Sequence, residues 1–257
     1  MYLLRTRFAI DIVADFLPPF LGVEDSQSNK AIIYCDGMPT VPNKKKFLEF
    51  WSRKGYWVIH PRYRGTWESG GEFLVDQPEK NIIDIIDQLK QDKKILSLWD
   101  NRVYEVDLKE INIIGTSFGG TTALLASLDA RVNKVVCISP VVDWSAPSED
   151  EPLDTFGEKV KNNFGEAYRF KMENWDKLKT GKFFNPVNYI DKINGGKIMI
   201  IHAKDDKVVR AKEVCEFAKK VNCKFELLES GGHLSASIIN KFWRSRVVKK
   251  FLNQKTT

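Results

Sequence analysis

The sequence predicts an α/β fold, with a mostly parallel central sheet and helices on both faces of that sheet. Short runs of branched apolar residues at 31–35, 111–114, 132–138 and 197–201 are typical of strands buried on both faces. Amphipathic segments lie between such runs, and residues 79–92 form the clearest of them. Strands that alternate with helices indicate parallel pairing through right-handed crossovers.

The composition fits one globular domain. The chain has 257 residues, of which 43% are hydrophobic and 29% are charged. No apolar run has the length of a membrane span, and the N-terminal residues lack the apolar stretch of a signal peptide. The four cysteines show no C-x-x-C spacing, and Cys35 and Cys137 lie in apolar runs, which indicates reduced thiols. We therefore expect a single cytoplasmic domain over residues 1–257.

The charge pattern argues against nucleic acid as a partner. The formal net charge is +6, which is modest for a chain of this length. The lysines at 44–46 and at 249–250 are not interleaved with aromatic residues, as they are in nucleic-acid platforms. Such runs are typical of solvated faces. We expect neither a nucleic-acid nor a membrane partner, and the oligomeric state stays open.

The elements of the N-terminal half follow from the apolar pattern and from the residues that break it. The expected order is an exposed strand at 5–13, a buried strand at 31–35, a helix at 44–54, a strand at 56–59, a loop at 62–73 and a helix at 79–92. Residues 95–109 give no clear pattern.

The C-terminal half continues the alternation after one interruption. The expected elements are strands at 111–114, 132–138, 197–201 and 224–228, a helix at 211–221, and a closing helix at 235–252 with Ile238, Ile239, Phe242 and Trp243 on its apolar face. The interruption at 141–192 is polar and rich in aromatic residues, and we expect short helices there. This insertion is either a cap over the substrate pocket or a packing layer away from it.

A Gly-x-Ser-x-Gly pattern marks the corner between the strand at 111–114 and the next helix. It consists of Gly115, Ser117 and Gly119. A serine hydroxyl becomes a good nucleophile when a strained corner exposes it beside a base, and glycines flank such a corner because a Cβ would collide there. The following helix start offers free N–H groups to an oxyanion. The alternative is a glycine-rich turn with an incidental serine.

A serine nucleophile needs a base, and the chain offers three histidines. His233 lies in a loop after the last expected strand, behind two glycines that let the loop bend toward the sheet edge. His202 and His60 end earlier strands and point to the same edge. We favour His233 as the base, and the alternative is a structural histidine in that loop.

The acid that orients the base has three candidates. Asp205 and Asp206 are adjacent after the strand at 197–201, so that only one of them can face the site. Asp143 follows the strand at 132–138 and ends at the same edge of the sheet. Each of the three can instead be a solvated turn aspartate, and residue types alone leave the choice open.

Taken together, these residues resemble the α/β-hydrolase fold. The order Ser117, acid, His233 is that of the fold, and the likeness covers roughly residues 30 to 245. The stretch 202–209 is similar to the family pattern His-Gly-x-x-Asp-x-x-Val-Pro. This resemblance places the acid at Asp206, with Ala203 in place of the glycine and Arg210 in place of the proline.

Two further stretches resemble the prolyl-oligopeptidase-like branch of that fold. Residues 55–58 with 62–71 are similar to its Gly-Tyr…Arg-Gly-Ser/Thr…Gly pattern. Residues 139–144 are similar to its segment after the sixth strand, in which the aspartate is not the triad acid. The resemblance therefore disfavours Asp143.

The oxyanion hole is also assigned by this resemblance. The branch carries His-Gly where this chain has Asp36-Gly37, and the likeness implies that the backbone N–H groups of Met38 and Phe118 bind the oxyanion. A carboxylate at position 36 would oppose an oxyanion unless it is turned away or paired. We expect Arg62 or Arg64 to pair with it, and an Asp36 that faces the pocket would weaken the hydrolase interpretation.

The sequence thus predicts a serine hydrolase that needs neither metal nor cofactor. Ser117 would attack an acyl carbonyl, His233 would take and return the proton, and Asp206 would hold the imidazole. A carboxylesterase acting on a small-molecule ester is favoured. The alternatives are a small serine peptidase of the aminopeptidase or acyl-peptide hydrolase type acting on short peptides, and a non-catalytic binding protein of the same fold.

Overall fold

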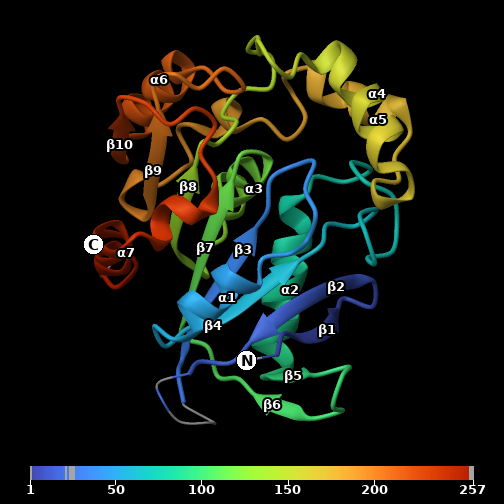
Figure 1. Ribbon diagram of the computed structural model, residues 1–257, viewed down its shortest axis with the longest axis vertical. Coiled ribbons are helices and arrows are strands. Elements are labelled where there is room, and N and C mark those ends of the chain that lie inside the picture. The colour runs from blue at the N-terminus through green and yellow to red at the C-terminus, as the bar shows by residue number, and fades with distance from the viewer. Residues whose placement is uncertain (1, 21, 23–26, 255–257) are drawn as a thin grey trace.

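The computed structural model describes residues 2–20, 22 and 27–254, and an eight-stranded sheet forms its centre (Figure 1). Its strands are, in spatial order, β1 (Leu4–Phe8), β2 (Ile12–Leu17), β4 (Trp57–Pro61), β3 (Lys30–Cys35), β7 (Glu110–Thr116), β8 (Val132–Ile138), β9 (Ile198–Ala203) and β10 (Lys224–Leu228). The last six of these run parallel to one another, and β1 and β2 pair antiparallel. The predicted mostly parallel sheet is confirmed.

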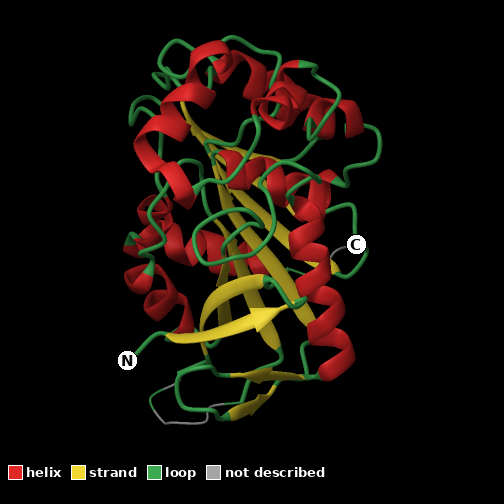
Figure 2. Cartoon of the chain, turned by 90° about the vertical axis from the view of Figure 1, so that its right-hand side faces the viewer, coloured by secondary structure: helices red, strands yellow, loops and turns green. Residues whose placement is uncertain are grey.

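Helices cover both faces of this sheet (Figure 2). They are α1 (Lys45–Ser52), α2 (Glu79–Asp92), α3 (Phe118–Ala126), α6 (Ala211–Val221), the short η4 (Ala236–Asn240) and α7 (Phe242–Leu252). Successive side chains of β3 enter opposite layers: Ile33 belongs to the buried cluster that includes residues of α2, α3 and α6, whereas Ile32 belongs to the cluster that includes residues of α1, η4 and α7. Both layers consist of buried apolar side chains, which explains why the strands are apolar throughout. None of the described helices is long and apolar enough to cross a membrane.

The N-terminal segment corrects the sequence prediction of one strand at 5–13. It forms the hairpin of β1 and β2, which turns at Ala9 and Ile10 with φ angles of 45° and 70°. The loop spans residues 9–11, and positive φ angles in hairpin turns usually fall on glycine or asparagine, so Ala9 and Ile10 give no turn signal. The hairpin matters for the site because β2 places Asp15 beside β4.

Two other segments differ in detail from the prediction. Within residues 95–109, a small antiparallel pair is formed by β5 (Lys94–Leu96) and β6 (Val103–Glu105). The closing helix is broken at Lys241, whose extended backbone (φ −62°, ψ 138°) separates η4 from α7. The break changes the phase of the helix, so that Phe242 and Trp243 are 71% and 54% exposed rather than on the apolar face.

Residues 141–192 contain short helices, as predicted. They are α4 (Leu153–Phe164), η1 (Gly165–Ala167), α5 (Met172–Lys179) and η2 (Pro186–Tyr189), and the short η3 (Gly195–Lys197) follows before β9. Both ribbon views place α4 and α5 beyond the C-terminal ends of the parallel strands (Figures 1 and 2). A separate aromatic core joins this segment to the sheet, because Phe156 and Trp175 belong to the same buried cluster as Phe118 of α3.

Candidate active site

Ser117 occupies a sharp corner between β7 and α3. Its backbone has φ 51° and ψ −119°, a conformation that costs a residue with a side chain about 1–3 kcal/mol. The surrounding backbone holds it there: the Ser117 N–H donates to Ile138 O at 2.9 Å, and Ser117 O accepts from the Gly120 N–H at 2.9 Å. Strain of this kind keeps a serine hydroxyl at the exposed tip of the turn.

The two glycines of the pattern are required by close backbone contacts. A Cβ on Gly115 would lie 2.1 Å from Gly119 O, and a Cβ on Gly119 would lie 2.1 Å from Cys35 O. No side chain fits at such distances, so that β3, β7 and α3 can meet only with glycine at both positions. The backbones of these three elements therefore lie closer together at the corner than an ordinary turn requires.

Asp206 and His233 form a hydrogen-bonded pair between two loops at the same edge of the sheet. Nδ1 of His233 lies 2.9 Å from Oδ2 and 3.2 Å from Oδ1 of Asp206. Oδ1 of Asp206 also accepts from the N–H groups of Val208 at 3.0 Å and Val209 at 2.9 Å. The carboxylate is thus fixed by its own loop before it contacts the imidazole.

This pairing determines the charge of Asp206. Burial by itself would raise the pKa of the Asp206 carboxyl. The hydrogen bond and charge of His233, together with the Val209 N–H, outweigh burial and leave that pKa below its ordinary value. Asp206 is therefore a carboxylate at neutral pH and accepts the Nδ1–H of His233.

Asp205 faces away from the imidazole and holds the loop that carries it. Its carboxylate accepts from the N–H of Gly231 at 3.2 Å and of Gly232 at 2.8 Å. These two backbone hydrogen bonds lower the pKa of Asp205. Because both donors directly precede His233, Asp205 holds the part of the loop that presents the His233 ring.

We expect Asp205→Ala to lower kcat/KM by roughly threefold to tenfold, since two hydrogen bonds to an exposed carboxylate are lost and the loop keeps its other contacts. Asp205→Asn retains an acceptor oxygen and should recover most of the activity. Steady-state kinetics on one ester would check this pair of variants. Equal losses in both variants would remove loop positioning as the explanation.

Asp143 is not brought to the imidazole. Its Oδ1 accepts from the Ser145 N–H at 3.0 Å, the Ser145 hydroxyl at 2.7 Å and Asn185 Nδ2 at 2.9 Å. Burial opposes these hydrogen bonds, but they prevail and lower the pKa of Asp143. The carboxylate closes a turn and ties it to residue 185.

The other two histidines are buried in the fold. His202 is fully buried, and its Nε2 lies 2.9 Å from Val209 O and 3.7 Å from Asp206 Oδ2. His60 is also buried, 3.5 Å from a carboxylate oxygen of Asp36. Both histidines contact neighbours of the candidate site, and neither lines the cavities at Ser117.

Burial lowers the pKa of both His60 and His202, and nearby carboxylates only partly offset this effect. The unfolded chain therefore takes up protons below about pH 6.5 that the folded chain does not. We expect the free energy of unfolding to fall as the pH drops from 7 through 5, by up to ~1.4 kcal/mol per pH unit for each histidine. Urea unfolding at several pH values measures this free energy. A free energy of unfolding that does not change between pH 7 and pH 5 would contradict the lowered pKa values.

Asp36 is paired, but not with the predicted arginines. Its carboxylate contacts Lys44 Nζ at 3.0 Å and accepts from Tyr34 OH at 3.1 Å and Thr40 Oγ1 at 3.2 Å. Burial favours the neutral acid, but His60 and Lys44 outweigh it and keep the pKa of Asp36 low. Asp36 does line a cavity that Ser117 also lines, but its charge is balanced by Lys44 and does not stand unpaired against an oxyanion.

The expected pairing of Asp36 with Arg62 or Arg64 is wrong. Arg62 Nη2 binds Asp15 Oδ2 at 2.6 Å, and Arg64 Nη1 binds Asp84 Oδ2 at 2.6 Å. The reason is the hairpin of β1 and β2, which brings the Asp15 carboxylate beside β4.

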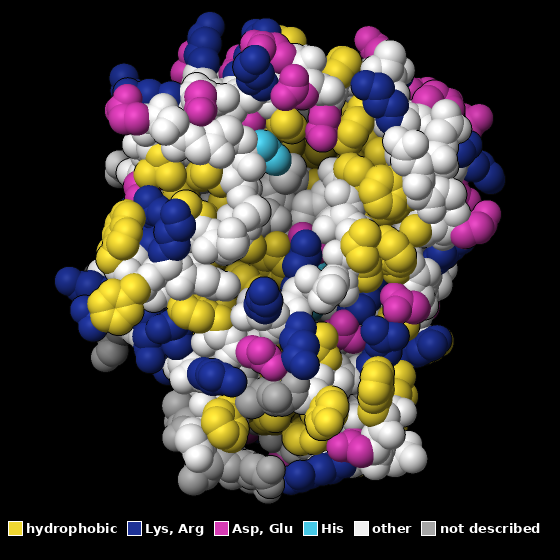
Figure 3. Space-filling view, viewed as in Figure 1, with side chains coloured by type: hydrophobic (Ala, Val, Ile, Leu, Met, Phe, Trp, Pro, Cys, Tyr) yellow, Lys and Arg dark blue, Asp and Glu magenta, His cyan; other side chains and the backbone are white. Residues whose placement is uncertain are grey.

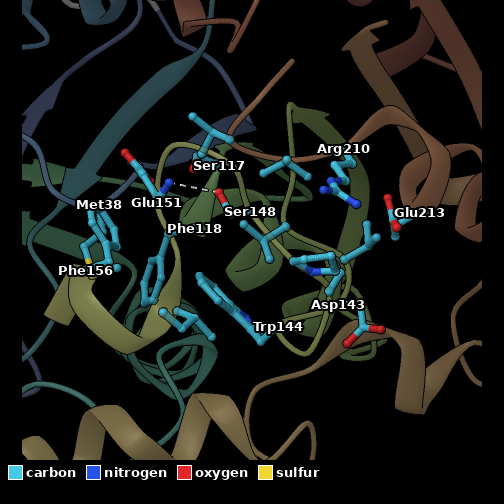
Figure 4. A pocket seen from close by; sticks show the side chains of 17 residues that line it. Met38, Ser117, Phe118, Asp143, Trp144, Ser148, Glu151, Phe156, Arg210 and Glu213 are labelled. Atoms are coloured by element: carbon cyan, nitrogen blue, oxygen red, sulfur yellow. Dashed lines mark hydrogen bonds between the residues drawn. The ribbon is translucent and has the colours of Figure 1, made fainter. Parts of the chain in front are cut away.

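Two cavities meet at Ser117. The larger, of about 780 Å³, is lined by Ser117, Met38 and His233, among others. The smaller, of about 50 Å³, is lined by Ser117, Met38 and the aromatic side chains of Phe118, Trp144 and Phe156 (Figure 4). The space-filling view shows a hollow on this face with a histidine at its edge (Figure 3). Ser117 and His233 thus open onto one cavity, although they come from distant parts of the chain.

The predicted oxyanion donors lie at this junction. A Cβ on Gly37 would be 3.3 Å from the Cβ of Ser117, so the segment with Met38 passes directly beside the serine. No backbone carbonyl of the described residues accepts a hydrogen bond from the N–H of Met38 or Phe118. These two N–H groups are therefore available to a ligand.

One residue at the junction is unexpected. Glu151 lines both cavities beside Ser117, and its N–H donates to Ser148 Oγ at 3.0 Å (Figure 4). Burial raises the pKa of Glu151, and the proximity of His233 opposes this. The residue lies in an irregular loop before α4, where no pattern separates it from its acidic neighbours.

No group of three or more histidine, cysteine or acidic side chains in the described ranges is arranged to hold a metal ion.

The sheet order, the antiparallel second strand and the strained serine corner define an α/β-hydrolase fold. Solved structures agree with it. An esterase of Pyrococcus furiosus aligns with a TM-score of 0.66 and 19% identity over 100% of this chain and 91% of its own. An α/β hydrolase of Penicillium aligns with a TM-score of 0.69 and 16% identity over 99% of this chain and 98% of its own. An acylaminoacyl peptidase of Pyrococcus horikoshii aligns with a TM-score of 0.65 and 14% identity over 98% of this chain and 40% of its own.

The family follows from the sequence match. The model of the prolyl oligopeptidase family matches residues 43–254, and the chain belongs to that family. Membership makes it a serine hydrolase. Among curated protein sequences the chain finds no match.

Proposed function

We propose that this protein is a carboxylesterase that cleaves small acyl esters through Ser117, His233 and Asp206. The observation that carries the proposal is the pair of hydrogen bonds between Asp206 and His233 at a cavity that Ser117 also lines. A carboxylate on Nδ1 leaves Nε2 of the imidazole free to accept the serine proton. The strained corner presents that serine to the substrate.

The reaction has two halves. Ser117 Oγ attacks the carbonyl carbon while His233 takes its proton, and the N–H groups of Met38 and Phe118 stabilise the oxyanion. His233 then gives the proton to the leaving alcohol, and an acyl-enzyme forms. Water, activated by the same imidazole, releases the acid. Asp206 stabilises the imidazolium in both halves.

The cavities support a short acyl group. The smaller cavity is lined by three aromatic rings and also by charged side chains such as Asp143 and Arg210, and it has room for only a few heavy atoms. Val141, Trp144 and Phe156 of segment 141–192 line it, which supports a role for that segment as the cap of one domain spanning residues 1–257. The four free cysteines, two of them buried, support a cytoplasmic location.

A small serine peptidase is the second candidate, and Glu151 is the observation that favours it. A carboxylate beside the nucleophile suits the free amino group of a peptide substrate. A panel of short esters, long esters and aminoacyl anilides separates the two functions. We expect turnover of p-nitrophenyl acetate and weaker turnover of long-chain esters. Hydrolysis of the anilides with no ester turned over would replace the esterase by the peptidase.

A further inference from the structure

The direction of the substrate in the two cavities follows from the position of the base. This step rests on the proposed function. His233 must return its proton to the leaving group, so the leaving group lies on the His233 side of Ser117. Only the larger cavity is lined by His233, whereas the smaller is lined by Phe118 and Trp144. The larger cavity therefore receives the leaving group, and the smaller one receives the acyl group.

Three consecutive lysines line the leaving-group cavity at the start of α1. They are Lys44, Lys45 and Lys46, and Asn43 precedes them on the same wall. A helix start carries partial positive charge and favours acidic residues, yet the first turn of α1 contains none and no side chain caps it. Helix stability does not account for lysines at this position.

Only the first of these lysines is closely neutralised. Lys44 Nζ lies 3.0 Å from the Asp36 carboxylate and 3.0 Å from Thr40 Oγ1. Lys45 has a loose pair with Glu49 at 3.9 Å. Lys46 has no ion-pair partner within the described ranges of the chain. Positive charge at this wall is thus left for a ligand.

The carboxylates of the same cavity do not cancel that charge. Asp36 is occupied by Lys44, Tyr34 and Thr40. Glu151 also lines the smaller cavity, which places it at the Ser117 end, whereas the lysines line the larger cavity alone. The space-filling view shows lysine and arginine side chains, in dark blue, beside the hollow (Figure 3).

We propose that Lys45 and Lys46 bind an anionic group, a carboxylate or a phosphate, on the leaving alcohol of the substrate. The substrate class is then an ester with a short acyl group and a negatively charged alcohol. Lysine ammonium groups at the rim of a cavity attract such a group and raise the rate of productive encounter. The attraction weakens with salt, because the rim is open to solvent.

The test compares two acetate esters of similar shape whose para substituent is either a carboxylate or a neutral amide, 4-carboxyphenyl acetate and 4-carbamoylphenyl acetate. The quantity measured is the ratio of kcat/KM for the carboxylate ester to that for the amide ester, which we compare between the parent and each variant. In Lys45→Gln/Lys46→Gln the ratio should fall roughly fivefold to tenfold, and added salt should lower it in the parent. The matched control is Lys220→Gln, which removes an exposed lysine of α6 and should leave the ratio unchanged.

The outcomes separate this inference from the proposed function. If the parent hydrolyses both esters and the double variant keeps the parental ratio, the anionic subsite is wrong and the esterase stands. If the parent hydrolyses neither ester, the proposed function fails and the subsite fails with it. Circular dichroism of the double variant confirms that a changed ratio comes from a folded protein.

Discussion

Ser117→Ala should lower kcat by roughly 10⁴–10⁶-fold, the loss seen when a triad nucleophile is removed. The variant loses only an oxygen atom of a half-buried side chain, and the backbone hydrogen bonds that hold the corner at φ 51° do not involve that side chain. We therefore expect a folded protein whose thermal midpoint is close to that of the parent. The measurement is kcat on p-nitrophenyl acetate with purified protein.

The control for this variant is another serine of the same cavity. Ser237 lines the leaving-group cavity, and its hydroxyl lies 2.7 Å from that of Ser235. Ser237→Ala should keep most of the parental rate. A Ser117→Ala protein that hydrolyses the ester at the parental rate would mean that a different group is the nucleophile.

Asp206→Asn should lower kcat/KM by up to ~10⁴-fold, because it would favour the wrong tautomer of the His233 imidazole. Oδ1 of Asp206 accepts two N–H groups, from Val208 and Val209, so an asparagine would turn its carbonyl oxygen toward them. Its NH₂ group would then face Nδ1 of His233. An Nδ1 that accepts a hydrogen bond leaves the ring proton on Nε2, which can no longer take the proton of Ser117.

The matched substitutions are Asp205→Asn and Asp143→Asn, which we expect to cost less than about tenfold. Asp205 holds backbone N–H groups and Asp143 closes a turn, so neither determines the tautomer of His233. All three variants are compared on one ester, with folding checked by circular dichroism. A large loss at Asp143 beside a nearly normal Asp206→Asn would move the acid to the earlier strand.

The buried strands and amphipathic helices could be predicted because they carry long, regular patterns. β8 and α6 have the predicted bounds, Val132–Ile138 and Ala211–Val221. A strand covered on both faces is a near-continuous apolar run, and α6 shows one apolar stripe. The serine corner could be predicted because its two flanking glycines form a recognisable pattern. Both are required, since a Cβ at either position would lie less than 3 Å from backbone atoms of other segments.

Features that depend on contacts between distant segments could not be predicted. The hairpin has neither glycine nor asparagine at its positive-φ positions Ala9 and Ile10, and without the hairpin the sequence indicates the wrong partners for Asp36. The true partner, Lys44, lies in a run that indicates a solvated face when it is considered alone. Glu151 lines the cavities at Ser117 because of the path of an irregular loop, which no periodicity determines.

The choice of acid shows the limit of residue types. Asp205 and Asp206 are equivalent as neighbours in a turn, and only the resemblance to a family pattern separated them. In the structure they bind opposite sides of one loop: Asp206 contacts the His233 ring, and Asp205 contacts the N–H groups of the two preceding glycines. The larger loss of kcat/KM at Asp206 than at Asp205 is a prediction, which the variants test.

The central claim is that Ser117 is an activated nucleophile, and covalent labelling tests it most directly. A fluorophosphonate reacts with a serine only when a base takes its proton and an oxyanion hole accepts the phosphoryl oxygen. After incubation with the probe and digestion, mass spectrometry should find one adduct, on the peptide that contains Ser117, and none in Ser117→Ala. A parent protein that stays unlabelled, or that carries the adduct on another serine, would contradict the account.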